Sequence, residues 1–304
     1  MSSSNKRASF GHFRISSNGL RLILAAVLLL VLALCWRIGT RTDYQTAVPI
    51  PETQEDLDQD FSFLALTHED QSTQAEAPAT LALDEYEDEC AITDAGEYLL
   101  SGELDGTLRI NAKGSTVHLY LDGVTIESPK GPAIFVEAAG KVIITLTDGS
   151  ENNISDSGNY AGTEDAEACI YSTSDLTING SGALTVHGFY KDAIRSKDVL
   201  KITDGTIRIQ CKRTGLHGND GVNISGGQVF IESEKNGVKT TRSGENGKGC
   251  LMISGGEVSI VAGRYALVTE EASLYIFDST VMLNGVVNDY DIRGKRMIEE
   301  GCVA

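Results

Sequence analysis

Hydrophobic residues recur in a fixed order between residues 168 and 285. Each of five passes contains one isolated aliphatic residue, an apolar pair spaced two residues apart, a turn rich in Gly, Asp or Ser, and a second apolar pair. The isolated residues are Ile170, Ile194, Leu216, Val238 and Leu267. Self-similarity at a fixed period is typical of repeat architectures, in which each repeat buries its apolar face against the next. We therefore expect these five side chains to stack in one column.

The length of the repeat indicates which architecture it builds. Matching positions are 24 residues apart from Ile178 to Ile202 and 22 apart from Ile202 to Ile224. Apolar side chains alternate with a period of two, as in half-buried strands, and no helical stripe accompanies them. Leucine-rich repeats have a similar length, but their L-x-x-L-x-L core is absent. The sequence predicts an all-β fold, a single-stranded parallel β-helix solenoid with about 22–24 residues per coil.

The N-terminal region is basic and then apolar. Residues 1–41 contain six Lys or Arg and no acid, and an apolar run extends from Leu22 to Trp36. The run is short enough for a cleaved signal peptide, but no small-x-small cleavage site follows it closely, and Trp36 with Arg37 suits a membrane interface. We expect a single-pass anchor, with the N-terminus cytoplasmic because more positive charge precedes the run than follows it.

Five segments follow from this interpretation. Residues 1–18 form a basic cytoplasmic tail and residues 19–39 the transmembrane signal anchor. Residues 40–89 form an acidic disordered linker, because residues 42–90 hold fourteen acids and no Lys or Arg, and such a segment cannot bury enough apolar surface to fold. The β-helix is expected outside the cytoplasm at residues 90–290, followed by a C-terminal tail at 291–304.

Composition excludes several classes of function. A formal net charge of −18 repels nucleic acid, because phosphate contacts need a basic face. The six cysteines form no C-x-x-C pair and have no His-rich neighbours, so zinc or redox chemistry is not expected. An acidic ligand would need bridging cations on such a surface.

Side chains one repeat apart should lie over each other at about the 4.8 Å spacing of strands. One predicted column contains Asp192 and Asn236, and another places Asp198 beside Asp220. Carboxylates this close repel each other unless a cation or a hydrogen-bond donor lies between them. They could cap turns through backbone amides or bind calcium, which prefers carboxylate and amide oxygens. The residues alone leave both interpretations open.

Two stretches carry a resemblance to a known family. Residues 170–180 read IYSTSDLTING, and residues 190–202 read YKDAIRSKDVLKI. Over about residues 92–285 the chain resembles the bacterial secreted carbohydrate-binding domains with a calcium-associated parallel β-helix, of the polygalacturonate- and cellulose-binding type, whose repeats carry N-D-G-I and K-D-D-L motifs. The resemblance implies a β-helix at the cell surface that binds calcium and polysaccharide, including acidic polysaccharide.

Carried over from this resemblance, the calcium ligands would be Asp192, Asp198, Asp220 and Asn236. The family's Asp-Gly-Ile motif is kept only in part, because Ala193 replaces the Gly after Asp192, and Asn236 stands where a later repeat would have its carboxylate. Hard cations take about six to eight oxygens, mostly from carboxylates, so this set is a poor cage. We expect the calcium sites to be weakened or partly lost.

The ligand contacts are expected around the loop that leads into Asp192. Its aromatic side chains could stack on sugar rings. Basic residues also cluster there by register, and they could bind uronates or form an ordinary solvated column. The basic cluster includes Lys212 and Arg213, and the residues predicted to contact ligand are Phe189, Tyr190, Lys191, Arg195 and His217.

No pair of acids with a spacing that suits glycoside hydrolysis emerges, so we predict no catalytic residue and no enzyme. The favoured function is a membrane-anchored, extracytoplasmic domain that binds polysaccharide without cleaving it. Two alternatives remain. One is a structural or adhesive surface spacer that binds a protein partner, and the other is a calcium-dependent polysaccharide lyase, which needs a base beside its metal.

Overall fold

Parallel strands make up most of the chain that the computed structural model describes, which is residues 61–163, 165–242 and 248–304. Partner strands are offset by one repeat along the sequence. Ile170, Ile194, Leu216, Val238 and Leu267 are aligned in one column, and each is fully buried. The register predicted from the hydrophobic pattern is therefore confirmed, and this column belongs to a continuous aliphatic core.

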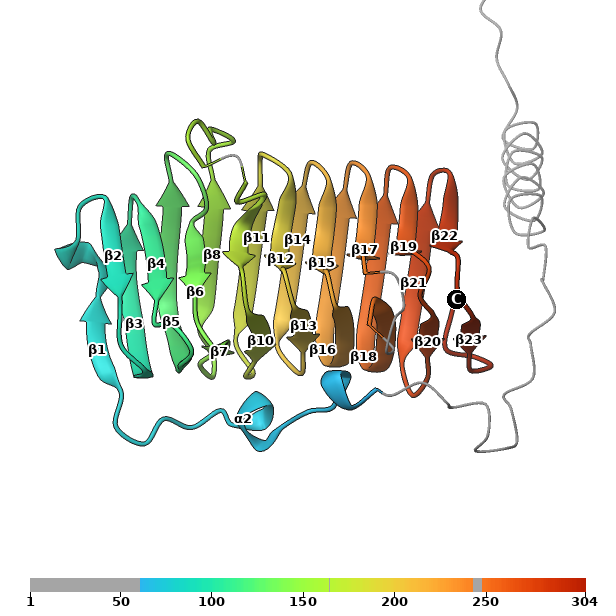
Figure 1. Ribbon diagram of the computed structural model, residues 1–304, viewed down its shortest axis with the longest axis horizontal. Helices are drawn as coiled ribbons and strands as arrows, with labels where there is room; N and C mark the ends of the chain where they lie inside the picture. The colour runs from blue at the N-terminus through green and yellow to red at the C-terminus, as the bar shows by residue number, and fades with distance from the viewer. Residues whose placement is uncertain (1–60, 164, 243–247) are drawn as a thin grey trace, which may run out of the picture. The chain divides into compact units, whose positions relative to one another are not determined.

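Among the described residues the strands form two sheets (Figure 1). The fourteen-stranded sheet contains β1 (Ala79–Ala82), β3 (Gly96–Leu104), β5 (Thr116–Ser128), β7 (Lys141–Leu146), β8 (Glu151–Asp156), β10 (Asp175–Asn179), β11 (Ala183–Gly188), β13 (Val199–Ile202), β14 (Thr206–Cys211), β16 (Gly221–Ser233), β18 (Cys250–Ala262), β20 (Leu274–Ile276), β21 (Thr280–Gly285) and β23 (Arg296–Ile298). The nine-stranded sheet contains β2 (Glu89–Ile92), β4 (Thr107–Asn111), β6 (Ile134–Ala138), β9 (Ala168–Ser172), β12 (Asp192–Ser196), β15 (Thr214–Gly218), β17 (Asn236–Thr240), β19 (Tyr265–Thr269) and β22 (Asn288–Ile292).

The pairings in the larger sheet correct the predicted fold class. Eight strands follow one another in a closed ring, β5-β7-β10-β13-β16-β14-β11-β8, in which β8 pairs again with β5. In its hydrogen-bond connectivity this ring is a closed eight-stranded parallel β-barrel, and the nine-stranded sheet is separate from it. The prediction of a single-stranded parallel β-helix solenoid with about 22–24 residues per coil is therefore wrong. The ring closes because β5 and β16 are thirteen residues long, and each pairs with two strands of a neighbouring repeat.

Glycine allows these long strands to continue through a turn. Gly123 in β5 and Gly227 in β16 have φ of 73° and 80°, in the left-handed region that favours glycine. A Cβ added to Gly227 would lie 2.6 Å from the carbonyl oxygen of Gly205 in the preceding repeat. The register shifts at this turn but the ladder resumes beyond it. The sequence pattern marks the turn correctly, but it does not show that strand pairing continues on both sides.

The segment 61–76, which we call the strap, lies against the larger sheet (Figure 1). It contains the 3-10 helix η2 (Ser62–Leu64) and the helix α2 (His68–Gln71). Leu64 is 1% exposed and packs in a cluster with Val199, Cys250 and Tyr275. Burying a Leu side chain contributes roughly 1.5–3 kcal/mol.

Asp70 holds the strap from its buried position. Its carboxylate accepts a hydrogen bond of 2.6 Å from Thr177 and lies 2.6 Å from Lys141 Nζ and 3.1 Å from Lys201 Nζ. The linker prediction is thus wrong for residues 61–89, which also contain β1 and the 3-10 helix η3 (Leu83–Glu85). The composition of this segment predicted disorder. The segment is ordered because its few apolar and charged residues pack against a surface formed by distant strands. Residues 40–60 lie outside the described residues.

The structure describes the predicted C-terminal tail but not the predicted N-terminal membrane anchor. Among the described residues, no helix is both long and apolar enough to cross a bilayer. The transmembrane helix predicted at 19–39 and the basic tail at 1–18 fall outside the described residues, so the structure lends the membrane anchor no support. Residues 291–304, predicted as a tail, contain β23, and Val303 bridges to Val281.

Candidate functional site

Two of the outward surfaces of the strands are already engaged by other parts of the chain. The strap covers outward side chains of β13 and β16, since Lys201 Nζ donates to the carbonyl oxygen of Ala65 at 2.7 Å and Asn223 Nδ2 to that of Leu64 at 3.0 Å. Outward side chains of β12 and β15 are held in ion pairs. The outward side chains of β14 and of the second halves of β16 and β18 remain exposed, and they provide a surface for a ligand.

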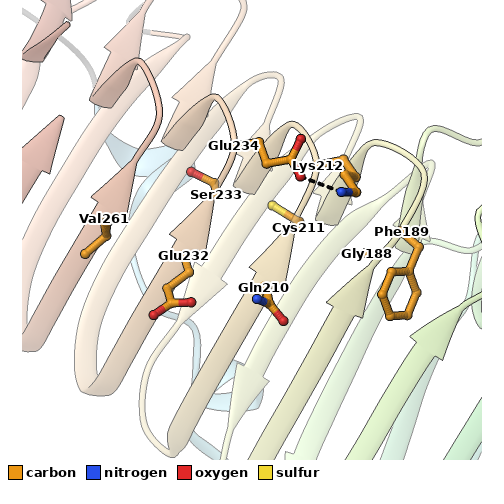
Figure 2. A pocket seen from close by; sticks show the side chains of 9 residues that line it. All are labelled: Gly188, Phe189, Gln210, Cys211, Lys212, Glu232, Ser233, Glu234 and Val261. Carbon is orange, nitrogen blue, oxygen red and sulfur yellow. Dashed lines mark hydrogen bonds and ion pairs between the residues drawn. The ribbon is translucent and has the colours of Figure 1, made fainter. Parts of the chain in front are cut away.

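A groove of about 490 Å³ follows the ends of these exposed strands (Figure 2). The side chains of Phe189 and Val261 are 53% and 48% exposed, and Gln210 and Glu232 lie between them. Gln210, Glu232 and Val261 are in register on adjacent strands. Apolar faces combined with a few polar groups are typical of surfaces that bind sugars. We call this surface the Phe189 groove, and it is lined by Gly188, Phe189, Gln210, Cys211, Lys212, Glu232, Ser233, Glu234 and Val261.

Phe189 is positioned by a buried carboxylate that the sequence analysis did not single out. Asp156 Oδ1 accepts hydrogen bonds of 2.9 Å from the backbone amides of Gly158 and Phe189, and Oδ2 accepts one of 2.9 Å from the Tyr160 hydroxyl. The ring of Tyr190 stacks on that of Tyr160 with centroids 4.1 Å apart. Burial raises the pKa of Asp156. The loop that carries Phe189 follows β11, and it is therefore held by the carboxylate of Asp156 at the end of β8.

A group of charged residues lies on the other side of the same turn, and we call it the charge network. It consists of Glu167, Lys191, Asp192, Arg195, Arg213 and His217. Asp192 is completely buried, and its two oxygens accept from Arg213 Nε at 2.7 Å and from Arg213 Nη2 at 2.9 Å. The same Nη2 donates to Glu167 Oε2 at 3.0 Å. Arg213 thus bridges two carboxylates.

Glu167 and His217 complete this network. Glu167 also accepts from Lys191 Nζ at 2.6 Å and from Arg195 Nη1. His217 Nδ1 lies 2.8 Å from Asp192 Oδ2, and we assign it as the donor because the carboxylate can only accept. Burial lowers the pKa of His217, so the ring is neutral near neutral pH, and its buried Nε2 has no hydrogen-bond partner in the described structure.

The two acids of the network are held ionised. Burial alone would raise the pKa of Asp192, but hydrogen bonds from His217 and Arg213 lower it to about 2. Burial likewise opposes ionisation of Glu167, and hydrogen bonds from Arg213 and Lys191 bring its pKa to about 2. Each of the three cations of the network, Lys191, Arg195 and Arg213, is therefore paired with at least one of its two ionised carboxylates.

The structure separates the five residues predicted to contact ligand. Phe189 lines the groove, whereas Tyr190 is stacked on Tyr160. Arg195 and His217 are adjacent in register, as predicted, but His217 is only 4% exposed. Lys191, Arg195 and His217 belong to the charge network, where each contacts the carboxylate of Glu167 or Asp192.

Of the four residues predicted to bind calcium, Asp192 and Asp220 are already bound by other side chains of the protein. Asp192 is bound by Arg213 and His217, and Asp220 lies 2.6 Å from Arg242 Nη1 and 2.5 Å from Lys248 Nζ. Asn236 is in register with Thr214, and its buried Oδ1 has no partner in the described structure. Within the described ranges, no group of three or more His, Cys, Asp or Glu side chains is arranged to hold a metal ion.

Asp198 lies next to Asp220, as its register predicts, because the amide of Asp220 donates to the carbonyl oxygen of Asp198 at 3.0 Å. Burial raises the pKa of Asp198, and the neighbouring carboxylates of Asp175 and Asp220 raise it further. This stack of acids faces Arg242 and Lys248. The carboxylates that the resemblance implied as calcium ligands therefore do not fit a calcium cage, because protein cations hold them.

Comparisons with protein families, with known proteins and with solved structures each found a match. The model of a family described as carbohydrate-binding domain-containing protein matches residues 86–292. A carbohydrate-binding domain-containing protein from Acetivibrio thermocellus is 33% identical over 223 residues, which is 71% of this chain and 78% of that protein. A solved structure described as a polysaccharide lyase-like protein from C. thermocellum, in a gadolinium derivative, superposes with a TM-score of 0.71 and 33% identity over 74% of this chain and 97% of the other.

Proposed function

Because this chain belongs to the family of carbohydrate-binding domain-containing proteins, we propose that it binds polysaccharide in the Phe189 groove and does not cleave it. The observation that carries the proposal is the exposed Phe189 ring at one end of an open groove. An aromatic face gives a sugar ring apolar contact, and polar side chains beside it can bind the hydroxyl groups.

Binding without cleavage is supported by the state of the basic side chains. A lyase needs a base that can reach the substrate, and general bases act within hydrogen-bond distance of the proton that they remove. Lys191, Arg195 and Arg213 are each paired with a carboxylate, and His217 is buried. In the groove itself, Lys212 Nζ lies 2.5 Å from Glu234 Oε1.

Affinity electrophoresis through gels that contain neutral or acidic polysaccharides tests the proposal. We expect wild type to be retarded by at least one polysaccharide. Phe189→Ala should weaken that binding about fivefold or more, because an aromatic contact contributes about 1 kcal/mol or more. Phe277→Ala is the matched control, since Phe277 is an exposed aromatic residue that does not line the groove.

Each alternative has its own signature in this experiment. Free migration of the wild type through every gel would contradict carbohydrate binding and favour a spacer that binds a protein partner. Release of unsaturated uronate products from an acidic polysaccharide would contradict binding without cleavage and favour a lyase. Equal loss of retardation in both variants would contradict the assignment to the groove.

We also propose that the domain acts outside the cytoplasm, where a polysaccharide ligand is accessible. Fractionation of the producing cells, followed by detection with an antibody against the described region, tests this location. Recovery in the cytoplasmic fraction alone would contradict it.

A further inference from the structure

Arg213 occupies the position between two carboxylates that a divalent cation would need. It donates to both oxygens of Asp192, at 2.7 and 2.9 Å, and to Glu167 at 3.0 Å. Asp192 is fully buried, and its remaining contact comes from His217 at 2.8 Å. A calcium ion takes about six to eight oxygen ligands, so it could bind here only by displacing the guanidinium.

At a second place, two protein cations lie over the stacked acids Asp198 and Asp220. Asp220 is 3% exposed, and each of its oxygens is bound by a different cation, Oδ1 by Arg242 at 2.6 Å and Oδ2 by Lys248 at 2.5 Å. Asp198 lies directly beside Asp220 and close to Asp175. Three neighbouring carboxylates repel one another unless positive charge is placed among them.

The two places share one arrangement. In each, carboxylates from successive repeats are brought together by the stacking of strands, and side-chain cations supply the charge that the stacking requires. An added calcium ion would lie beside a fixed guanidinium or ammonium group, and like charges at this distance repel strongly in a partly buried setting.

We propose that Arg213 in one place, and Arg242 with Lys248 in the other, substitute for divalent cations, so that these two places are stabilised by the protein's own side chains and do not bind calcium. The proposal does not depend on which ligand fills the Phe189 groove. It also makes a positive prediction, because removing the cations should expose a set of carboxylates that a metal can use.

Calcium titration of the wild-type chain is the first test. We expect no heat of binding by calorimetry with millimolar calcium, and we expect Tm in excess calcium and in excess chelator to agree within about 1 °C. Saturable binding of calcium to the wild type, together with a higher Tm, would overturn the proposal without any variant being made.

The second test removes the protein cations and measures whether calcium then raises Tm. The double variant Arg242→Met/Lys248→Met keeps the aliphatic stems but removes both charges above Asp220. In chelator its Tm should be lower than that of the wild type, and calcium should raise it by about 5 °C, as expected for a bound ligand in excess. Arg213→Met should behave in the same direction.

The control variant is Arg109→Met. Arg109 also contacts two carboxylates, but those of Glu89 and Glu137 are 42% and 45% exposed, whereas that of Asp220 is 4% exposed. Its Tm should not respond to calcium. If the double variant folds and is equally unresponsive, the cations do not substitute for a metal and the proposal is wrong.

Discussion

At the scale of single residues, the turn from Phe189 to Asp192 lies between the Phe189 groove and the charge network. Phe189 faces the groove, while Lys191 and Asp192, two and three residues later, belong to the charge network. The sequence brought these residues together by register and correctly placed Arg195 beside His217. It could not show that Glu167 would pair with three cations, because Glu167 lies just before β9, outside the apolar pattern of the repeat.

Loss of the buried Asp192 carboxylate should lower the stability of the fold. Asp192→Asn removes the charge that pairs with Arg213 and leaves the guanidinium partly buried with Glu167 alone. We expect the free energy of unfolding to fall by about 3 kcal/mol, as for other buried ion pairs from which one partner is removed. Urea unfolding followed by circular dichroism measures this change.

The comparison variant is Glu234→Gln, whose side chain is 61% exposed and pairs with Lys212. An exposed pair contributes less than about 1 kcal/mol. Equal destabilisation by the two variants would contradict the structural role assigned to Asp192.

At the scale of elements, the aliphatic columns could be predicted and the strap could not. Each column follows from a local rule, namely alternation of apolar residues at a spacing of two and recurrence after one repeat. The strap depends on matches across the chain, such as that between Asp70 and Lys201, which are 131 positions apart. A polar, acidic segment has the composition that predicts disorder, even when distant strands form a complementary surface that binds it. For the same reason the sequence did not show that β5 and β16 would close a ring.

Truncating the apolar contact of the strap should loosen it. Leu64→Ala creates a cavity against Val199 and Tyr275, and we expect a loss of about 3 kcal/mol in the free energy of unfolding. Cleavage by a protease in the segment 61–76 should also become faster. Val286→Ala is the control, since Val286 is 76% exposed and should change stability by less than about 0.5 kcal/mol.

At the scale of the whole molecule, net charge and local charge have different roles. The chain carries a formal charge of −18, yet the charged groups near the groove are largely paired with one another. The resemblance correctly indicated a carbohydrate-binding domain family, but the calcium-associated parallel β-helix that it also implied is not confirmed. It could not show the Arg and Lys side chains that reach the implied acids from other strands.

Stability should depend on pH in the acidic range. The pKa values of Asp192 and Glu167 are about 2 in the folded chain, below their ordinary values of 3.8 and 4.5. A lowered folded pKa means that the stabilisation is fully present above the ordinary pKa and is lost as pH falls through the folded pKa. We expect the free energy of unfolding to decline between about pH 4.5 and pH 2.

Urea unfolding across this pH range measures the decline. The double variant Asp192→Asn/Glu167→Gln should show a shallower dependence on pH, because two of the linked protons are removed. An unchanged slope would indicate that other carboxylates account for the acid sensitivity.

The position of the strap has a consequence for the order of folding. Residues 61–76 precede every strand to which they bind, and the bond between Asn223 and the carbonyl oxygen of Leu64 closes a loop of 159 positions. Such long-range contacts cannot form until the intervening chain has been made and stacked, because the entropy of loop closure is repaid only by a surface that already exists. During synthesis from the N-terminus, the strap therefore emerges before the repeats that it will cover. Among the described residues, it is the first segment to be made and among the last to be buried.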